Sequence, residues 1–215
     1  MANTTAPRFV TPKGYAEYPH IEVPDTKFDE KGSYHVNLVI DKDQAQDTIK
    51  KLEDVLANFV ATDAKFKEAK ARGKTINMQD IYETCDGGGN IRLKFKQKAT
   101  YTRKADGKEI QVKIPVFDSK GTPLKDTKIG GGSVLRVCFT ANPYYMPATR
   151  SVGLSLRLVA VKVIEMKEWG DKSASSYGFG EEEEGYEASE ETKQTNPEDN
   201  PPFDEMEEDD PSQDF

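Results

Sequence analysis

The chain has 215 residues, of which 35% are hydrophobic and 32% are charged, and this composition indicates that part of it does not fold into a core. The two cysteines, Cys85 and Cys138, lie far apart in the sequence, which excludes a disulfide framework and fits a reducing compartment. No apolar run approaches the length of a membrane span and residues 1–10 lack the features of a signal peptide, so we expect a soluble intracellular protein.

The formal net charge of −8 conceals an asymmetry between two parts of the chain. Residues 171–215 hold 17 acidic side chains against two lysines, or −15, whereas residues 1–170 hold 28 basic and 21 acidic side chains, or +7. The acidic part has almost no aliphatic residues, so it buries too little apolar surface to offset the entropy lost on ordering. We therefore predict a folded basic domain over 1–170 and a disordered acidic tail over 171–215.

The first predicted elements of the basic domain are two strands and a helix. Glu22–Asp25 indicates a short strand that stops at Pro24, and Tyr34–Ile40 is rich in strand-forming residues. A helix follows, because Asp43–Gln46 has the form of a capping box and apolar residues then recur with helical spacing. These residues are Ile49, Leu52, Leu56, Phe59 and Phe66. The pattern stops near Arg72–Gly73, where glycine suits the position after a helix.

Further strands are predicted after the helix, separated by glycine-rich turn signals. They span Ile91–Lys96, Glu109–Ile114, Val134–Thr140 and Leu154–Ile164. Five or six short strands with one inserted helix favour a mainly β domain, and a five-stranded Greek-key barrel of the oligonucleotide-binding (OB) type fits this count. A β-sandwich would accommodate the same strands, so the pattern leaves both architectures open.

Residues Ile91–Arg103 give the clearest indication of a ligand. Alternation along the strand puts apolar side chains on one side and four cations on the other. The cations are Arg92, Lys94, Lys96 and Lys98, and Tyr101 and Arg103 follow them. Cations can follow a phosphate backbone while a ring stacks on a base, which contributes about 1–3 kcal/mol whatever the base. The alternative is a solvated strand face whose lysines protect an exposed edge.

A second candidate segment is Asn142–Arg150, which we predict as a loop between two strands. Tyr144 and Tyr145 are adjacent and cannot both enter one core, so at least one should be exposed, with Arg150 near enough to reach a phosphate. Alternatively, the segment is a packed corner of the barrel that buries one of the two rings. Further rings, each equally consistent with a structural or a stacking role, are Tyr15, Tyr18, Phe28, Tyr82 and Phe117.

No motif for catalysis, a cofactor or a metal is recognised. Ile129–Ser133 is glycine-rich but precedes a strand and lacks a following Gly-Lys-Ser/Thr, so it is not a P-loop. The two histidines, His20 and His35, and the two cysteines match no zinc-ligand spacing, so no metal site is predicted. An enzyme is the least expected class of protein.

The acidic tail ends in a single aromatic residue, Phe215, beside a free carboxylate. Its candidate partner-binding residues are Asp209, Asp210, Asp214 and Phe215. The sequence supports two roles for the tail equally. In the first, the tail only solubilises the protein. In the second, the ring of Phe215 enters an apolar pocket of a partner while the acids face a basic rim.

Several segments share their order and spacing with one known family. They are Gly14–Glu17, Tyr34–Leu38, Val116–Gly121, Ile129–Val137, Pro143–Tyr144, Ser151–Leu158 and Asp214–Phe215. They resemble the single-stranded DNA-binding proteins of tailed bacteriophages, best represented by the one from short-tailed coliphages. The resemblance implies an OB-type barrel with an added helix, a location in the host cell cytoplasm, and a role in phage DNA replication, recombination and repair.

The resemblance also implies partners. The tail, through its final aromatic residue, would contact the phage DNA polymerase and primase-helicase and would compete with DNA for the basic groove, and a homodimer is implied because family members often dimerise. Tyr144 matches a DNA-contacting position of the family, whereas Tyr145 and Met146 stand where a relative has lysine and tryptophan. We therefore predict a sequence-nonspecific single-stranded DNA-binding protein. The alternatives are an RNA-binding module or a protein-interaction module with an acidic tail.

Overall fold

The computed structural model describes residues 7–27, 29–103, 107–125 and 127–167. The chain divides into two units, Met1–Trp169 and Gly170–Phe215, and all described residues belong to the first. The predicted acidic tail therefore lies outside the described residues, together with its candidate partner-binding residues. Those residues are Asp209, Asp210, Asp214 and Phe215.

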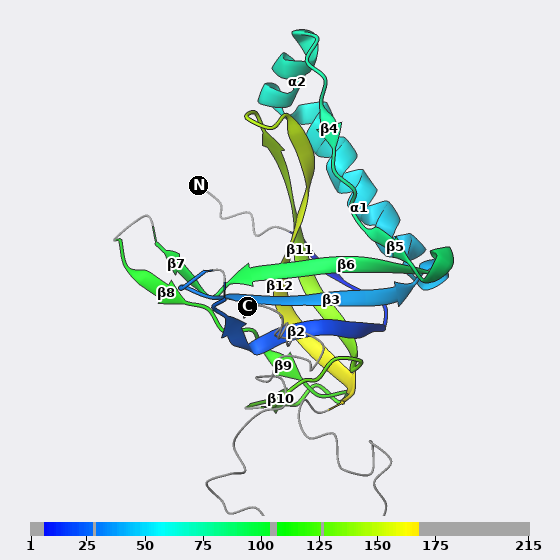
Figure 1. Cartoon of the computed structure of the whole chain (residues 1–215), viewed down its shortest axis with the longest axis vertical. Helices are drawn as coiled ribbons and strands as arrows, with labels where there is room; N and C mark the ends of the chain where they lie inside the picture. The colour runs from blue at the N-terminus through cyan, green and yellow to red at the C-terminus, as the bar shows by residue number, and fades with distance from the viewer. Residues whose placement is uncertain (1–6, 28, 104–106, 126, 168–215) are drawn as a thin grey trace, which may run out of the picture. The chain divides into compact units, whose positions relative to one another are not determined.

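Five long strands of the first unit pair in a closed circuit (Figure 1). They are β2 (Gly14–Asp25), β3 (Ser33–Asp41), β6 (Asn90–Lys98), β11 (Val134–Met146) and β12 (Ser151–Glu165). β2 pairs with β3, β3 with β6, β11 with β12 and β11 with β2, all antiparallel, while β6 and β12 run parallel. This circuit confirms the predicted mainly β fold with a five-stranded OB-type barrel.

Alternating side chains fill the barrel and set its outer face. In β6, Ile91, Leu93 and Phe95 are buried, and the four cations between and after them point outward, as predicted. The ring of Phe95 meets that of Phe139 from β11 with centroids 5.0 Å apart. Burying each large apolar side chain contributes about 1.5–3 kcal/mol, so a slip of one residue, which would bury the cations, is strongly disfavoured.

Closure of the barrel depends on a close backbone approach at Gly14. This residue of β2 pairs with Leu135 of β11. A Cβ atom at position 14 would lie 2.6 Å from the carbonyl oxygen of Val39 and 2.8 Å from side-chain atoms of Leu38 and Ile40. Only glycine leaves room for β2 to contact both β3 and β11 at this point.

The connection from β3 to β6 carries two helices, α1 (Lys42–Thr62) and α2 (Ala64–Ala71), in the described residues. The prediction of one continuous helix is therefore wrong at Asp63. Its backbone is extended, and its carboxylate accepts a hydrogen bond from the Phe66 N–H at 2.7 Å, which ends α1 and caps α2. Neither helix combines the length and the apolar character that a membrane span needs.

The start of α1 also differs from the prediction. Asp41 is the N-cap, because its carboxylate accepts from the Gln44 N–H at 3.0 Å, and the predicted capping box beginning at Asp43 lies inside the helix. The apolar stripe is as predicted: Ile49, Leu52 and Leu56 are buried. The helix ending near Gly73 is confirmed too, since Gly73 has a φ of +67°.

Shorter elements complete the described residues. They are β1 (Arg8–Val10), β4 (Asn77–Met78), β5 (Glu83–Cys85), η1 (Asp86–Gly88), β7 (Thr100–Thr102), β8 (Glu109–Gln111), β9 (Val116–Phe117) and β10 (Pro123–Leu124). The predicted strand Glu109–Ile114 shortens to β8, because only these residues pair with β7. The predicted strand at Glu22–Asp25 is the end of β2 and continues past Pro24.

The predicted loop Asn142–Arg150 is mostly strand. β11 and β12 stay paired as far as Met146 opposite Ser151, so only the turn at 147–150 is irregular. In Figure 1 this two-stranded ribbon extends beyond the barrel toward α2. Val152 of the ribbon is fully buried in a small cluster with Leu56 of α1 and Phe66 of α2, which explains why the strands continue.

Candidate nucleic-acid interface

The outer face of β2, β3 and β6 is a surface of aligned side chains. The strand registers form three rows: Tyr15, Val39 and Arg92; Glu17, Asn37 and Lys94; and His20, His35 and Lys96. Lys98 follows opposite Ser33 on the same side. We call these residues the cationic face. In OB barrels the second and third strands, here β3 and β6, present the surface that binds oligonucleotides.

Two of the predicted cations on this face are paired with carboxylates. The Arg92 guanidinium donates from Nε and Nη2 to Glu17 at 2.6 and 3.0 Å, and from Nη1 to Glu83 at 3.4 Å. Lys94 also contacts Glu83. The hydrogen bonds from Lys94 and Arg92 lower the pKa of Glu83, and those to Glu17 and Glu83 raise the pKa of Arg92. Arg92 and Lys94 thus have locally compensated charges.

Lys96 and Lys98 differ from their neighbours. Both side chains are exposed at the end of β6, and within the described part of the chain neither has a carboxylate partner. Lys96 also stands opposite Arg157 of β12, whose guanidinium donates to the Gln97 side chain. The positive charge available on this face is therefore concentrated where β6 meets β12 and the row of histidines.

Strand β2 carries two exposed rings, one of which belongs to the cationic face. Tyr15 is 61% exposed and Tyr18 is 74% exposed, and Tyr15 belongs to the same row as Arg92. Tyr18 has a φ of +48°, a left-handed conformation in which bulky residues are uncommon, and it lies in the irregular part of the β2–β3 register. Neither ring is buried in the protein, so both are available to stack on a base.

Tyr101 and Arg103 lie apart from the strand that was predicted to carry them. β6 ends at Lys98, and Tyr101 belongs to β7, which forms a separate two-stranded hairpin with β8. Tyr101 is 44% exposed. Both residues remain candidate contacts, now on a hairpin that follows the cationic face.

Tyr144 and Tyr145 point to opposite sides of the β11–β12 ribbon, and both are half-buried. The Tyr145 ring meets Phe66 of α2 edge-on, with centroids 5.8 Å apart. Tyr144 pairs with Gly153, where an added Cβ would come within 2.9 Å of the tyrosine hydroxyl oxygen. Arg150 is exposed in the turn beyond them. Tyr145 thus has a packing role, and Tyr144 and Arg150 remain candidate contacts.

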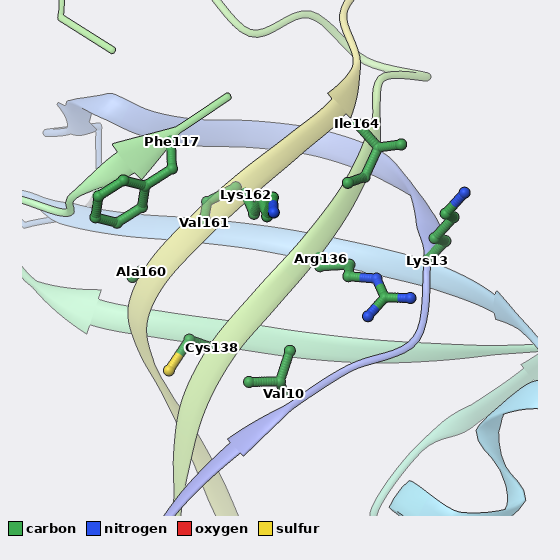
Figure 2. Close-up of a pocket in the computed structure, with 9 residues that line it drawn as sticks. All are labelled: Val10, Lys13, Phe117, Arg136, Cys138, Ala160, Val161, Lys162 and Ile164. Carbon is green, nitrogen blue, oxygen red and sulfur yellow. The ribbon is translucent and has the colours of Figure 1, made fainter. Parts of the chain in front are cut away.

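A second cationic surface lies on the outer side of β11 and β12 (Figure 2). Val10, Phe117, Cys138, Ala160, Val161 and Ile164 line an open hollow of about 550 Å³ there, together with Lys13, Arg136 and Lys162. Its cations surround mainly aliphatic side chains, and the ring that lines it, Phe117, is half-buried, whereas Tyr15 and Tyr18 are exposed. It differs in this respect from the cationic face and offers a natural control surface.

Residues 12–166 match the sequence model of the family described as "Single-stranded DNA-binding protein, Bacteriophage T7". This chain belongs to that family. The family's single-stranded DNA-binding protein from Escherichia phage T7 is 30% identical over an alignment 217 positions long, which covers 93% of each protein. The protein of the same name from Enterobacteria phage T3 is 30% identical over 106 residues, 49% of this chain and 46% of that protein. The predicted resemblance is confirmed.

Solved structures of phage single-stranded DNA-binding proteins have the same fold. The crystal structure of bacteriophage T7 gp2.5 matches with a TM-score of 0.65 and 27% identity, covering 77% of this chain and 96% of that one. The single-stranded DNA-binding protein of bacteriophage Enc34 matches with a TM-score of 0.50 and 12% identity, over 80% of this chain and 89% of that one. The second likeness concerns the fold alone.

Sequence reasoning did not single out several residues of the cationic face. Asn37, His20 and His35 join it through strand pairing, and Arg157 of β12 stands beside it opposite Lys96. Tyr15 and Tyr18 were recognised as rings, but their exposure was not predicted. Alternation along Tyr34–Ile40 would have indicated that His35 and Asn37 share one side, although not which strand they face.

Proposed function

We propose that this chain binds single-stranded DNA without sequence preference through its cationic face. The observation that supports the proposal most is the position of Lys96 and Lys98. Both lack carboxylate partners in the described residues. They lie on β6, a strand of the face that binds oligonucleotides in OB barrels, and the same sheet carries the exposed Tyr15 and Tyr18. Membership of a family named for single-stranded DNA binding agrees with this.

In this proposal charge supplies the affinity for DNA, and stacking supplies the preference for single strands. Lysines that neutralise phosphates release counterions, which gives affinity but does not distinguish single strands from duplex. Tyrosine rings stack on unpaired bases, which are hidden inside a duplex, so stacking supplies the preference for single strands. Neither contact reads a base edge, so binding is insensitive to sequence.

The ion pairs of Glu83 with Lys94 and Arg92 distinguish the free protein from the DNA-bound protein in this proposal. In the free protein the Glu83 carboxylate pairs with both cations. A DNA phosphate approaching the face exchanges one anion for another on Lys94, whose side chain is 58% exposed and therefore accessible. Arg92 keeps its bidentate contact with Glu17, so we assign it to supporting the strand face and Lys94 to contacting DNA after this exchange.

The acidic tail acts as a tethered competitor and a docking arm in the same proposal. A segment of charge −15 attached to a domain of charge +7 is present at high effective concentration and competes with DNA phosphates. DNA then releases the tail, whose Asp209, Asp210, Asp214 and Phe215 recruit the phage DNA polymerase and primase-helicase. The resulting roles are protection of single strands and assembly of replication proteins, with the chain as a homodimer.

Fluorescence anisotropy of a labelled oligo-dT tests the proposal. The full chain should bind it tightly, duplex competitor should displace it poorly, and affinity should fall steeply with salt. A chain ending at residue 170 should bind more tightly, because it lacks the competing tail. Equal competition by duplex, or by an RNA oligomer of the same length, would contradict the assignment to single-stranded DNA. Unchanged affinity of the shortened chain would contradict the competition by the tail alone.

A further inference from the structure

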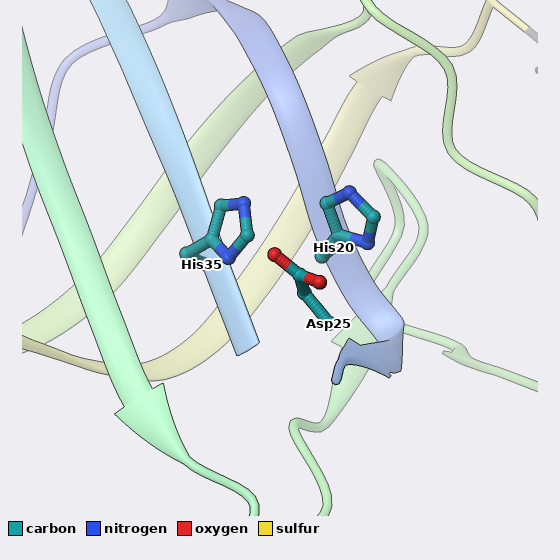
Figure 3. Close-up of side chains that lie close together, drawn as sticks. All are labelled: His20, Asp25 and His35. Atoms are coloured by element: carbon teal, nitrogen blue, oxygen red, sulfur yellow. The ribbon is translucent and has the colours of Figure 1, made fainter. Parts of the chain in front are cut away.

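His20, His35 and Asp25 converge at one point of the β2–β3 pair. The two histidines are opposite each other in the strand register, and their ring centroids lie 4.7 Å apart at an angle of 38°. Figure 3 shows the Asp25 carboxylate directed into the space between the two rings. One nitrogen from each ring and one carboxylate oxygen all lie within 4.8 Å of one another.

An irregularity in β2 creates this convergence. Asp25 pairs with Ser33 and His20 pairs with His35, and Ser33 and His35 face the same side because they are two residues apart in β3. Asp25 lies five positions after His20, and in a regular strand residues an odd number of positions apart face opposite sides. The register shift between them returns Asp25 to the histidine side.

We propose that His20, His35 and Asp25 form a binding site for Zn²⁺ with an open coordination position. Two imidazole nitrogens and one carboxylate oxygen are ligands that zinc takes, and three protein ligands leave a fourth position for water or another ligand. In a tetrahedral site the ligand atoms lie about 3.4 Å apart. The present ligand atoms lie within 4.8 Å of one another, so zinc binding requires these half-buried side chains to draw closer together.

A backbone hydrogen bond orients the carboxylate of Asp25 for this role. The Lys27 N–H donates to Asp25 Oδ1 at 2.9 Å, which holds the carboxylate and leaves its other oxygen for a metal. Such contacts to metal ligands fix ring and carboxylate orientation in known sites. The zinc-ligand spacings sought in the sequence are local, so a site assembled across two strands was not recognised.

The site lies on the cationic face, in the same row as Lys96. A bound Zn²⁺ therefore adds positive charge beside Lys96 and Lys98, and its open position can take an anionic oxygen ligand such as a phosphate. This consequence rests on the proposed function, whereas zinc binding itself does not. If zinc strengthens DNA binding by some factor, DNA strengthens zinc binding by the same factor.

Histidine-selective NMR of the full chain, without DNA, tests the site directly. His20 and His35 are the two histidines of the chain, so every imidazole signal reports on it. After removal of metal with a chelator, titration with ZnCl₂ should shift or broaden both ring signals together, with saturation at one equivalent. Mg²⁺, which prefers oxygen ligands, should leave the ring signals in place. Unchanged imidazole signals, with zinc bound only at the acidic tail or the thiols, would overturn the proposal.

Calorimetric titration of variants provides an independent readout. His35→Gln and Asp25→Asn should each weaken the one-equivalent zinc binding by about tenfold or more, since each removes a ligand. Cys85→Ser removes a thiol, a type of side chain that can bind zinc, at a position outside the proposed site. It should leave zinc affinity unchanged. Loss of affinity in Cys85→Ser but not in His35→Gln would overturn the proposal. Neither titration contains DNA, so failure of the zinc site and failure of DNA binding are distinguished.

Discussion

The double substitution of Lys96 and Lys98 by glutamine should weaken binding of single-stranded DNA in a salt-dependent way. Both lysines are exposed and without carboxylate partners in the described residues, so each has its full charge available for one phosphate. Each phosphate contact on a single strand contributes about −0.7 to the slope of log K against log salt concentration. Losing two contacts should therefore reduce the slope by about 1.4.

The same relation gives the loss of affinity at each salt concentration. With equal affinities at 1 M salt as the reference, a slope difference of about 1.4 corresponds to about 25-fold weaker binding at 0.1 M salt and about tenfold weaker binding at 0.2 M. Anisotropy titrations of labelled oligo-dT at four or more salt concentrations measure both quantities. Urea unfolding of each variant should show an unchanged midpoint, because the substituted side chains lie outside the core.

Lys13→Gln with Lys162→Gln is the matched control. Both residues line the hollow between β1, β11 and β12, and the pair removes the same net charge from the domain. If the cationic face is the interface, this control should change the slope by far less than the Lys96 and Lys98 pair. Equal effects of the two pairs would show that overall charge, and not this face, sets the affinity and would refute the reasoning.

Other substitutions separate the remaining contributions. Tyr18→Ala should lose one stack, about 1–3 kcal/mol or about 5- to 150-fold in oligo-dT affinity, and an unchanged affinity would remove this ring from the interface. Tyr145→Ala should leave DNA binding in place but lower the free energy of unfolding by about 2 kcal/mol, since its ring packs against α2. Glu83→Gln should tighten binding and steepen the salt slope by about 0.7, because it releases its lysine partner on β6, and a flatter slope would contradict the exchange of anions. Gly14→Ala should lower the urea midpoint, since overpacking where the barrel closes costs about 1–3 kcal/mol, and an unchanged midpoint would show that the strands adjust.

The barrel was predictable because local patterns determine most of it. Strand alternation in β6 sorted the buried Leu93 from the exposed Lys94, and the apolar stripe of α1 identified Leu52 and Leu56. These patterns reflect burial, which sequence periodicity reports directly. The helix break at Asp63 was missed because the apolar spacing continues across it to Phe66, while the capping side chain decides where a new helix begins.

The candidate site was predicted only where it lies on one strand. The cations of β6 follow each other in sequence, so their shared direction was evident, but the carboxylates that neutralise Arg92 come from β2 and β5. The extension of β11 to Met146 was missed for a related reason. Pro143 and Pro147, on either side of the two tyrosines, indicate a loop. The contacts of Val152 with the helices, which stabilise the ribbon, are not visible in the sequence.

Lysine acetylation footprinting of the full chain, with and without oligo-dT, tests the central claim most directly. Mass spectrometry measures the modification of every lysine in one sample, so the two cationic surfaces are compared under identical conditions. We expect oligo-dT to protect Lys96 and Lys98 and to leave Lys13 and Lys162 as reactive as before. Protection of Lys13 and Lys162 with continued reactivity of Lys96 and Lys98 would contradict it and would move the interface to the outer side of β11 and β12.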